Sequence, residues 1–217
     1  MRLIDLSQPV YDDCPNCPVH PPVRSEAIAT HAADGWLCEK LTLSNHTGSH
    51  VDAPLHKIAG GKSLDDMPLS TWVGSAWIVD LRDSAADRPI TGDLLQSKLA
   101  HLPPDQIVLL ATSWGDRRAK TDEWHHHAPF VHPSGAEWLV SRKARGVGID
   151  HYSIGGSGDF NAVTHTILLG NGVWIVEDLK FPAEVFTLPM PVKFWTLPIN
   201  LKGHTGAFCR PVIELSM

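Results

Sequence analysis

The residues best suited to chemistry lie in one short segment, which holds three histidines and one aspartate within eleven positions: His46, His50, Asp52 and His56. Imidazole and carboxylate groups are ligands for zinc, manganese or iron, and the segment has no cysteine of the kind that closes structural zinc sites. Gly48 allows the backbone to turn sharply, so that the side chains on either side of it converge. The spacing therefore predicts a metal site.

The end of this segment adds a proton-transfer candidate. Pro54 stiffens the chain just before His56, which fixes the direction of that side chain. A single histidine is more often a hydrogen-bonded surface or core residue than a metal ligand. Three histidines and an aspartate around a glycine turn, however, strongly favour a metal site.

Two other groups of reactive residues have weaker patterns. His125–His127 stand among charged residues, which predicts a surface or pocket-rim loop, with substrate contact as the alternative. Cys14 and Cys17 form a CxxC pattern in a proline-rich stretch, and no second cysteine pair completes a zinc site. We interpret them as incidental loop cysteines. The isolated histidines receive no functional role: His20, His31, His101 and His132.

The elements that must position the metal site alternate between strands and helices. Alternating or continuous apolar runs predict strands at Arg2–Ser7, Leu37–Ser44, Ala76–Leu81, Gln106–Thr112, Val147–Ile149, Val173–Val176, Met190–Leu201 and Ala207–Leu215. Helical spacing predicts helices at Thr91–Ala100, Ser134–Arg145 and Asn161–Leu169, with Thr91 as an N-cap and cations in the last turn of the second. We expect one α/β domain with a mixed sheet over residues 1–217.

Composition narrows the class of protein. A chain of 217 residues buries a substantial core without disulfides, and a net charge of −6 argues against nucleic acid as a partner. The apolar runs are too short to cross a bilayer, and Asp5 interrupts any secretory signal, so we expect no membrane partner and a cytoplasmic location. The expected partner is a small-molecule substrate.

The metal segment also carries a family resemblance. His46-x-Gly48-Ser49-His50-x-Asp52-x-Pro54-x-His56 resembles the HxG[TS]HxDxPxH signature of the cyclase-like metal-dependent hydrolases, which include bacterial kynurenine formamidases and isatin hydrolases. The opening residues 4–7 and the segment Gly148-Ile149-Asp150 are also similar to that family. The resemblance implies its swivelling β/β/α fold and assembly into a homodimer or homotetramer.

The resemblance implies a full ligand set as well. His46, His50 and Asp52 would hold a first metal. The family has a further histidine on a late helix and a glutamate twelve residues on, positions that His165 and Glu177 occupy here. Asp52 would bridge to a second metal held by these two residues. Zinc is the expected ion and manganese the alternative, with one or two ions per chain.

The function implied is hydrolysis of an amide bond in a small molecule. An aryl formamide such as N-formylkynurenine is the first candidate substrate, and a cyclic amide or lactone, as for isatin hydrolases, is the alternative. A divalent metal lowers the pKa of bound water from about 16 to about 7, so metal-bound hydroxide attacks the carbonyl. His56, not needed as a ligand, is the expected catalytic general acid/base. The alternative of another class is a non-catalytic, metal-dependent binding protein.

Overall fold

Nine strands form one mixed sheet in the computed structural model, which describes residues 1–215. They are β1 (Arg2–Asp5), β4 (His50–Asp52), β5 (Val73–Asp80), β7 (Ile107–Ala111), β9 (Gly146–Ile149), β10 (Trp174–Glu177), β11 (Val192–Trp195), β12 (Gly206–Phe208) and β13 (Val212–Leu215). Their order is β1-β13-β11-β5-β7-β9-β10-β4-β12. The predicted α/β fold with a mixed sheet is confirmed; the last two residues of the predicted domain lie outside the described part.

The centre of the sheet is parallel. Strands β5, β7, β9 and β10 run in the same direction, and every residue of β7 is buried. Burial on both faces explains why Ile107–Ala111 reads as a continuous aliphatic run rather than as an alternating one. Strand β5 is only partly buried, although its sequence predicts the same environment.

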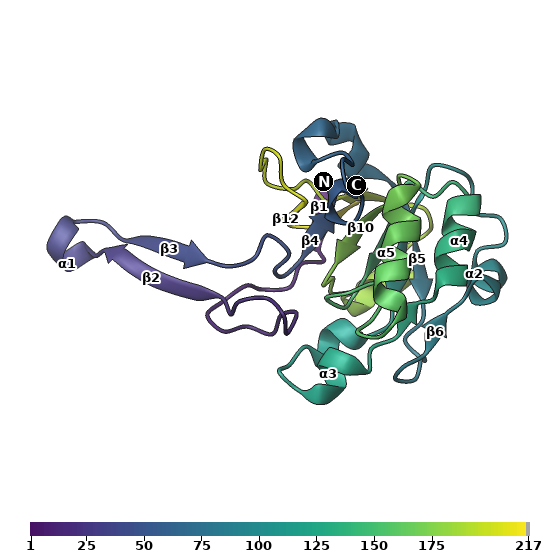
Figure 1. Ribbon diagram of the computed structural model, residues 1–217, viewed down its shortest axis with the longest axis horizontal. Helices are drawn as coiled ribbons and strands as arrows, with labels where there is room; N and C mark the ends of the chain where they lie inside the picture. The colour runs from purple at the N-terminus through teal and green to yellow at the C-terminus, as the bar shows by residue number, and fades with distance from the viewer. Residues whose placement is uncertain (216–217) are drawn as a thin grey trace.

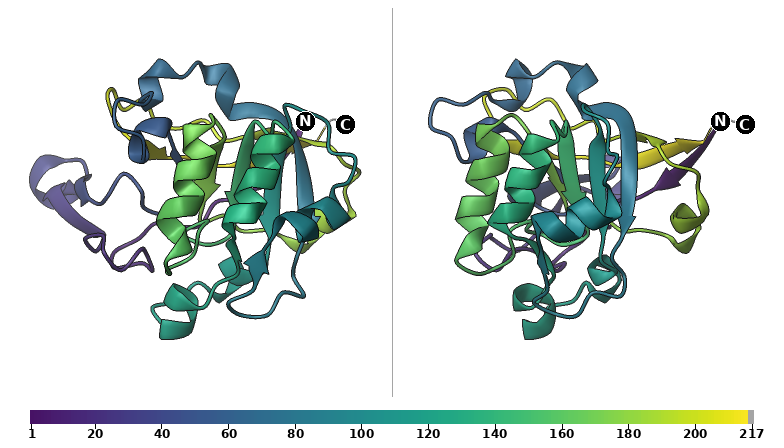
Figure 2. Two further views of the ribbon diagram at one scale, coloured as in Figure 1. Left: turned by 45° about the vertical axis from the view of Figure 1, so that its right-hand side comes forward. Right: turned by 90° about the vertical axis from the view of Figure 1, so that its right-hand side faces the viewer.

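Three helices cover one face of this centre. They are α2 (Gly92–Lys98), α4 (Pro133–Ser141) and α5 (Phe160–Gly170), and they lie side by side (Figures 1 and 2). Side chains alternate across a strand, so Val108 and Leu110 of β7 pack toward the helices. Ile107 and Leu109 point into a second core on the opposite face.

The sheet curls around this second core. Strands from opposite ends of the strand order contribute to the same apolar cluster, with Ile4 and Ile213 from one end and Val51 and Ala207 from the other. Only three residues separate β12 from β13, so the chain crosses directly from one edge toward the other. The single strand predicted at Ala207–Leu215 is therefore wrong, because Pro211 has no N–H for a continuous ladder.

A long two-stranded arm extends from this body (Figure 1). It consists of β2 (Arg24–Ala29), the short helix α1 (His31–Asp34) and β3 (Cys38–Thr42), with β2 and β3 antiparallel. Within its two strands only Ala29 is buried. The strand predicted at Leu37–Ser44 exists, but it lies on the arm instead of covering the body.

The remaining elements are short. A pair of two-residue strands, β6 (Pro89–Ile90) and β8 (Phe130–Val131), runs in parallel, and α3 covers Asp122–His126. The 3₁₀ turns are η1 (Pro54–His56), η2 (Leu64–Asp66), η3 (Leu69–Trp72), η4 (Trp114–Arg117) and η5 (Ala183–Thr187). In residues 1–215, every helix is too short or too polar to span a bilayer.

Two helix predictions can be compared in detail. Thr91 caps α2 as predicted, and its hydroxyl oxygen accepts a hydrogen bond from the Leu94 N–H at 3.3 Å. Helix α4 ends at Ser141, earlier than predicted, and Lys143 takes a left-handed conformation with φ of 54°. The predicted cations in the last turn of this helix are thus beyond its end, and Arg145 binds other groups.

Candidate metal centre

Strand pairing brings the first ligand candidates together. His50 and Asp52 are two residues apart on β4, so their side chains share one face of the sheet. Strand β10 pairs with β4 in an antiparallel register that sets Glu177 directly opposite His50. Directly opposed residues also share a face, so Glu177 joins the other two without any special turn. Its Oε2 lies 3.3 Å from His50 Nε2.

His165 reaches the same place from helix α5. Its Nδ1 lies 2.8 Å from the carbonyl oxygen of Asn161, one helical turn earlier, and this hydrogen bond sets the imidazole tautomer. Its Nε2 therefore points to the cluster, 3.2 Å from Glu177 Oε1 and 3.8 Å from Asp52 Oδ2. The predicted arrangement of helix, glycine turn and returning strand is present.

The glycine turn orients His50 in the same manner. Gly48 has φ of 61°, and a Cβ there would lie 2.5 Å from the side chain of Val10, so only glycine fits. Its carbonyl oxygen lies 2.8 Å from His50 Nδ1, which leaves Nε2 directed at the carboxylates.

His46 lies in the turn before β4 and completes the cluster of candidate ligands. Its Nε2 lies 2.8 Å from the hydroxyl of Thr205, and its Nδ1 lies 2.7 Å from Asp52 Oδ1. If the hydroxyl accepts from Nε2–H, Nδ1 carries a lone pair that faces a carboxylate. Such a close approach requires a proton or a metal cation between the two atoms.

His56 is the last residue of η1 and lies beside this cluster. The centroid of its imidazole is 4.3 Å from that of His46 and 5.9 Å from that of His165. Potential ligand atoms of His46, Asp52 and His56 lie within 4.8 Å of one another, as do those of His50, Asp52 and Glu177. Distance alone therefore places His56 among both the possible ligands and the possible proton carriers.

The donor set fits a divalent cation. Both carboxylate oxygens of Asp52 are buried, and neither has a hydrogen-bond partner within residues 1–215. Buried carboxylates are normally paired, hydrogen-bonded or bound to a metal. Asp52 belongs to both groups of potential ligands, so it is the residue placed to be shared by two ions. Nitrogen and oxygen ligands of this kind suit zinc and manganese.

The electrostatics of the cluster favour bound positive charge. Burial opposes ionisation of Asp52, but the close approach of His46 and the positive charges of His46 and His50 hold the pKa of this carboxyl well below its usual range. Burial and the charge of Asp52 act to raise the pKa of Glu177, yet hydrogen bonds from His165 and His50 lower it to about 2. The pKa of His50 rises to about 9 despite burial, because of Glu177 and Asp52. A metal ion can replace these protons, since the same carboxylates stabilise it.

His56 behaves differently from His50. Burial lowers the pKa of His56 to about 4, and neighbouring His46 and His165 act in the same direction against the charge of Asp52. Its imidazole is consequently neutral near pH 7, in the protonation state that accepts a proton.

A cavity of about 250 Å³ opens over the cluster. Besides cluster residues, its wall contains Cys17, Val19, His20, Lys57, Tyr152, Ser153 and Asn161. The sequence interpretation gave His20 no role and treated Cys17 as incidental, so the structure adds both to the wall. No local pattern identifies them, because a residue distant in sequence holds their segment in place.

That residue is Arg118, which is almost completely buried. Its Nε donates to Asp178 Oδ2 at 3.0 Å, while its two Nη atoms donate to the carbonyl oxygens of Pro9 and Pro15. Asp178 directly follows Glu177. Arg118 thus ties the proline-rich segment that leads to the cavity wall to the strand end that carries Glu177.

The second histidine run lies at the surface, as predicted, but two of its residues are helical. His125 and His126 belong to helix α3 rather than to a loop, because Thr121 caps this helix by accepting from the Trp124 N–H. His127 pairs with Asp87 on the surface at 2.9 Å. None of the three histidines is among the residues that line the cavity over the cluster, so the structure does not support the substrate-contact alternative.

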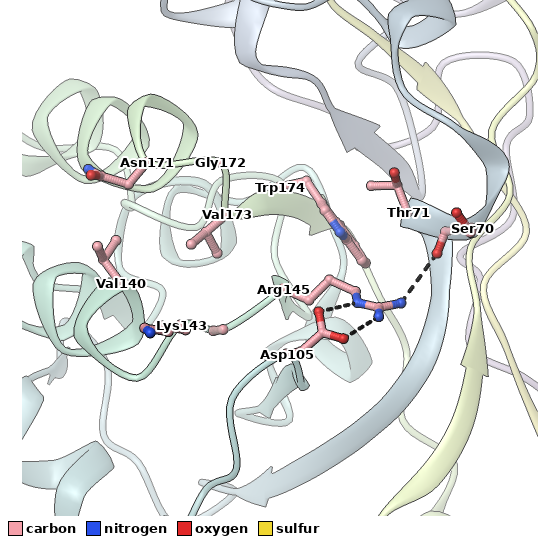
Figure 3. Close-up of a pocket in the computed structure, with 11 residues that line it drawn as sticks. Ser70, Thr71, Asp105, Val140, Lys143, Arg145, Asn171, Gly172, Val173 and Trp174 are labelled. Carbon is pink, nitrogen blue, oxygen red and sulfur yellow. Dashed lines mark hydrogen bonds and ion pairs between the residues drawn. The ribbon is translucent and has the colours of Figure 1, made fainter.

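The candidate ligands lie at the smaller of the two cavities at the ends of β10. A larger hollow of about 510 Å³ lies at the opposite end of β10, beside Trp174 (Figure 3). Its most prominent polar contact is the ion pair between Arg145 and Asp105, and Arg145 also donates to the carbonyl oxygen of Val73. In the described chain, the groups of potential metal ligands lie at the other cavity.

Comparison with known proteins agrees with this site. Residues 4–155 match the Cyclase family, described as "Putative cyclase", and the chain belongs to this family. A kynurenine formamidase from Bacillus mycoides (strain KBAB4) is 30% identical over 212 residues, 97% of this chain and 96% of that protein.

Solved structures show the same fold. Isatin hydrolase A from Ralstonia solanacearum has a TM-score of 0.86 at 23% identity, covering 98% of this chain and 91% of that one. A chain from Bacillus stearothermophilus, described as a predicted metal-dependent hydrolase, has a TM-score of 0.79 at 26% identity, covering 98% and 97%. Together with the donor set, these similarities support a metal-dependent amide hydrolase.

Proposed function

We propose that this protein hydrolyses the amide bond of an aryl formamide such as N-formylkynurenine. The observation that carries the proposal is the convergence of His46, His50, Asp52, His165 and Glu177 beneath a cavity that a neutral His56 also lines. The similarity to a kynurenine formamidase over nearly the whole chain supports the formamide as substrate.

The five cluster residues would hold the metal, with zinc as the expected ion and manganese as the alternative, at one or two ions per chain. A bound divalent metal would supply a nucleophile from water near neutral pH and polarise the carbonyl group. Asp52 is the residue shared if two ions bind, since it belongs to both groups of potential ligands.

His56 would move the protons of the reaction. As a neutral base it accepts a proton from the water that attacks the formyl carbon. It then donates a proton to the amine nitrogen as the C–N bond breaks, releasing formate and the arylamine. Burial keeps His56 neutral before the reaction, and its neighbours His46 and His165 reinforce this state.

A cyclic amide or lactone of the isatin type is the second candidate substrate. The cavity of about 250 Å³ lies below the roughly 300–1,000 Å³ of sites for drug-sized ligands, which favours a compact fused ring. The catalytic groups would be the same, and ring opening would replace the release of formate.

The decisive experiment is hydrolysis of N-formylkynurenine by chelator-treated protein that is reconstituted separately with zinc and with manganese. Turnover restored by one ion supports the formamidase and names the working metal. Rebinding of the metal without turnover contradicts this substrate, and isatin and related lactones are then tested in the same way. Metal-dependent binding of these molecules with no turnover would instead favour the non-catalytic binding protein.

The arm supports self-association into a homodimer or homotetramer. Ile28, Trp36 and Leu41 on the arm are 60%, 55% and 59% exposed, and an extended arm leaves most of its surface without contact in a single chain. Exposed apolar surface of this kind marks interaction sites. Sedimentation velocity measures the assembly directly, and a monomer at micromolar concentration would contradict the proposal.

A further inference from the structure

Asn171 and Gly172 form an exposed Asn-Gly pair at the connection between α5 and β10 (Figure 3). In such a pair the backbone nitrogen of the glycine attacks the side-chain carbonyl carbon of the asparagine. The attack closes a succinimide ring and releases ammonia, and water then opens the ring to aspartate or to isoaspartate. Glycine favours this reaction, because it has no Cβ to obstruct the approach and adopts more backbone conformations than other residues.

The other asparagines of the chain lack this combination of exposure and a following glycine. They are Asn16, Asn45, Asn161 and Asn200. Asn16 is buried, and Asn45 and Asn161 are half-buried. Asn200 is exposed, but Leu201 follows it, and the leucine side chain hinders attack by the backbone nitrogen. Asn171 is therefore the asparagine most open to deamidation.

Two hydrogen bonds oppose the reaction in the folded protein. Asn171 Nδ2 donates to the carbonyl oxygen of Ile167 at 2.8 Å, which turns the side chain back along α5. The Gly172 N–H donates to the carbonyl oxygen of Leu169 at 3.2 Å. Each bond is worth a factor of about 3 to 10, so together they slow the attack about 10- to 100-fold relative to an open chain. They do not prevent it, because exposed helix ends open at a small cost in free energy.

The connection that carries this pair joins two of the candidate metal ligands. His165 lies on α5 before it, and Glu177 lies on β10 after it. The bond from Gly172 and a second bond, from the Val173 N–H to the carbonyl oxygen of Leu168 at 3.0 Å, close the end of the helix. Val173 is buried and leads directly into β10. The backbone of this turn therefore sets the position of α5 against β10.

Isoaspartate would disturb this turn in two ways. The main chain then runs through the former side chain and is longer by one methylene carbon, which disturbs the two bonds that close the helix. The new carboxylate also lies at the C-terminal end of α5, where the helix dipole disfavours negative charge. His165 Nε2 lies 3.2 Å from Glu177 Oε1, so a shift of α5 changes the spacing of these two ligands.

We propose that Asn171 is a site of spontaneous deamidation, and that isoaspartate at this position weakens metal binding by loosening the connection between His165 and Glu177. The reaction consumes one water and releases one ammonia, and it needs no other reagent. The capacity to bind metal therefore falls with the age of the molecule. This inference concerns the candidate metal centre and does not depend on the substrate.

The first test follows deamidation of the purified protein at mildly alkaline pH by peptide mass mapping. Asn171 is expected to convert before the other asparagines and to give both aspartate and isoaspartate, which chromatography separates. Its rate should be about 10- to 100-fold lower than in a synthetic peptide of residues 166–177. Earlier conversion of another asparagine, or an unchanged Asn171 under conditions that convert the peptide, would overturn the proposal.

Two conservative variants control this measurement. Asn171→Gln keeps the side-chain amide, but its longer side chain has to close a six-membered ring, which forms much more slowly, so conversion at this position should stop. Asn200→Gln makes the same change at an exposed asparagine without a following glycine. It should leave the rate at Asn171 unchanged.

The second test measures zinc binding by metal-free protein after the aged forms have been separated. The isoaspartate form is expected to bind zinc about 10-fold more weakly than fresh protein, the low end of the range for groups that support metal ligands. Asn171→Asp adds the charge without the extra carbon and should keep the affinity of the wild type, as should aged Asn171→Gln. Equal zinc affinity in the isoaspartate form and fresh protein would contradict the effect on the metal centre. An equal loss in Asn171→Asp would assign the effect to charge and contradict the role of the longer backbone.

Discussion

The candidate metal centre and the arm place their side chains in opposite environments, one buried and one exposed. In the centre, neighbouring strands and helix α5 bring ionisable residues into a buried cluster, and Asp52 is only 1% exposed. On the arm, β2 and β3 pair only with each other, and most of their residues are exposed. The centre is thus determined by contacts within the chain, whereas the arm lacks contacts that bury its apolar residues.

The difference shows where sequence alternation stops being informative. Leu37–Ser44 alternates between apolar and polar residues, which normally indicates a strand with one face on the core. The strand forms, but Leu37 and Leu41 remain 52% and 59% exposed. Alternation thus identifies an apolar strand face, but it does not show whether residues of the same chain pack against that face.

The largest expected effect tests the centre. Asp52→Asn keeps the shape of the side chain but removes the charge that both groups of potential ligands share. We expect loss of bound metal and a fall in kcat/KM of more than about 100-fold, beyond the 10- to 100-fold typical of residues that only support ligands. Metal content and turnover are measured together.

Asp83→Asn, a change of an exposed aspartate, is the control and should alter neither quantity. Full metal content in Asp52→Asn would show that Asp52 is not a ligand.

His56→Ala separates the two possible roles of this histidine. As a general acid/base, its loss lowers kcat by about 100- to 10,000-fold while metal content stays constant. The measurement is kcat in the reconstituted variant with metal analysis of the same sample. A metal content that falls in step with activity would make His56 a ligand instead.

Arg118→Met tests whether the buried centre depends on its anchoring. The substitution leaves Asp178 buried without its partner, so we expect the free energy of unfolding to fall by about 3 to 5 kcal/mol. Burial already raises the pKa of Asp178 to about 6, so without Arg118 its protonated form is favoured further. Stability should therefore decrease as the pH rises through this pKa, and the loss in metal-free protein is larger at pH 8 than at pH 5.

Urea denaturation measures this effect at both pH values. Arg117→Met is the matched control, because Arg117 is exposed and pairs with Glu123 on the surface. Its free energy of unfolding should change by less than about 0.5 kcal/mol. Similar losses in both variants would contradict an anchoring role specific to Arg118.

Substitutions on the arm should affect assembly rather than the fold of one chain. Changing Ile28, Trp36 and Leu41 together to serine removes its exposed apolar groups, so we expect smaller oligomers by sedimentation velocity. The far-ultraviolet circular dichroism of the body should be retained, since none of these side chains is buried.

The corresponding change of exposed apolar residues on the body, at Leu3, Val163 and Ile199, is the control. Dissociation in the control but not in the arm variant would move the interface away from the arm.

The smallest effect is expected at the cavity beside Trp174, which lies away from the candidate metal ligands. Arg145 holds the pKa of Asp105 below its ordinary value, so this pair stabilises the fold above the ordinary pKa of aspartate, about 3.9. Asp105→Asn should lower the free energy of unfolding at pH 7 by less than about 1 kcal/mol, because the Asp105 side chain is largely exposed. The difference from wild type should disappear as the pH falls below about 3, and a constant difference would exclude the ion pair as its cause.

The sequence is sufficient for the parts of the site that depend on local geometry. The spacing from His46 to His56 is a property of one short segment, and the cap at Thr91 is equally local. Both features depend on a turn or a cap that the neighbouring residues determine. His165 and Glu177 are identified instead through the family resemblance, and helix α5 and the pairing of β10 with β4 bring them to the site.

The parts that the sequence does not reveal depend on distant contacts. His20 and Cys17 reach the cavity wall because Arg118, about 100 positions later, binds the backbone before them. Pro211 interrupts the ladder between β12 and β13, but no local residue pattern shows that the two strands lie near opposite ends of the strand order. Which strands become neighbours depends on the packing of the whole core and not on a local sequence motif.

The pairing of β4 with β10 joins residues that are far apart in sequence, and this delays the assembly of the candidate metal centre during synthesis. His50 and Glu177 face each other although 127 positions separate them in the chain. At about 5–20 residues per second, a ribosome needs roughly 6–25 s to add the later residue after the earlier one. During most of this interval the nascent chain carries only the candidate ligands of the early segment, because His165 and Glu177 are added near its end. The complete centre is therefore available for metal loading only after most of the chain has been made.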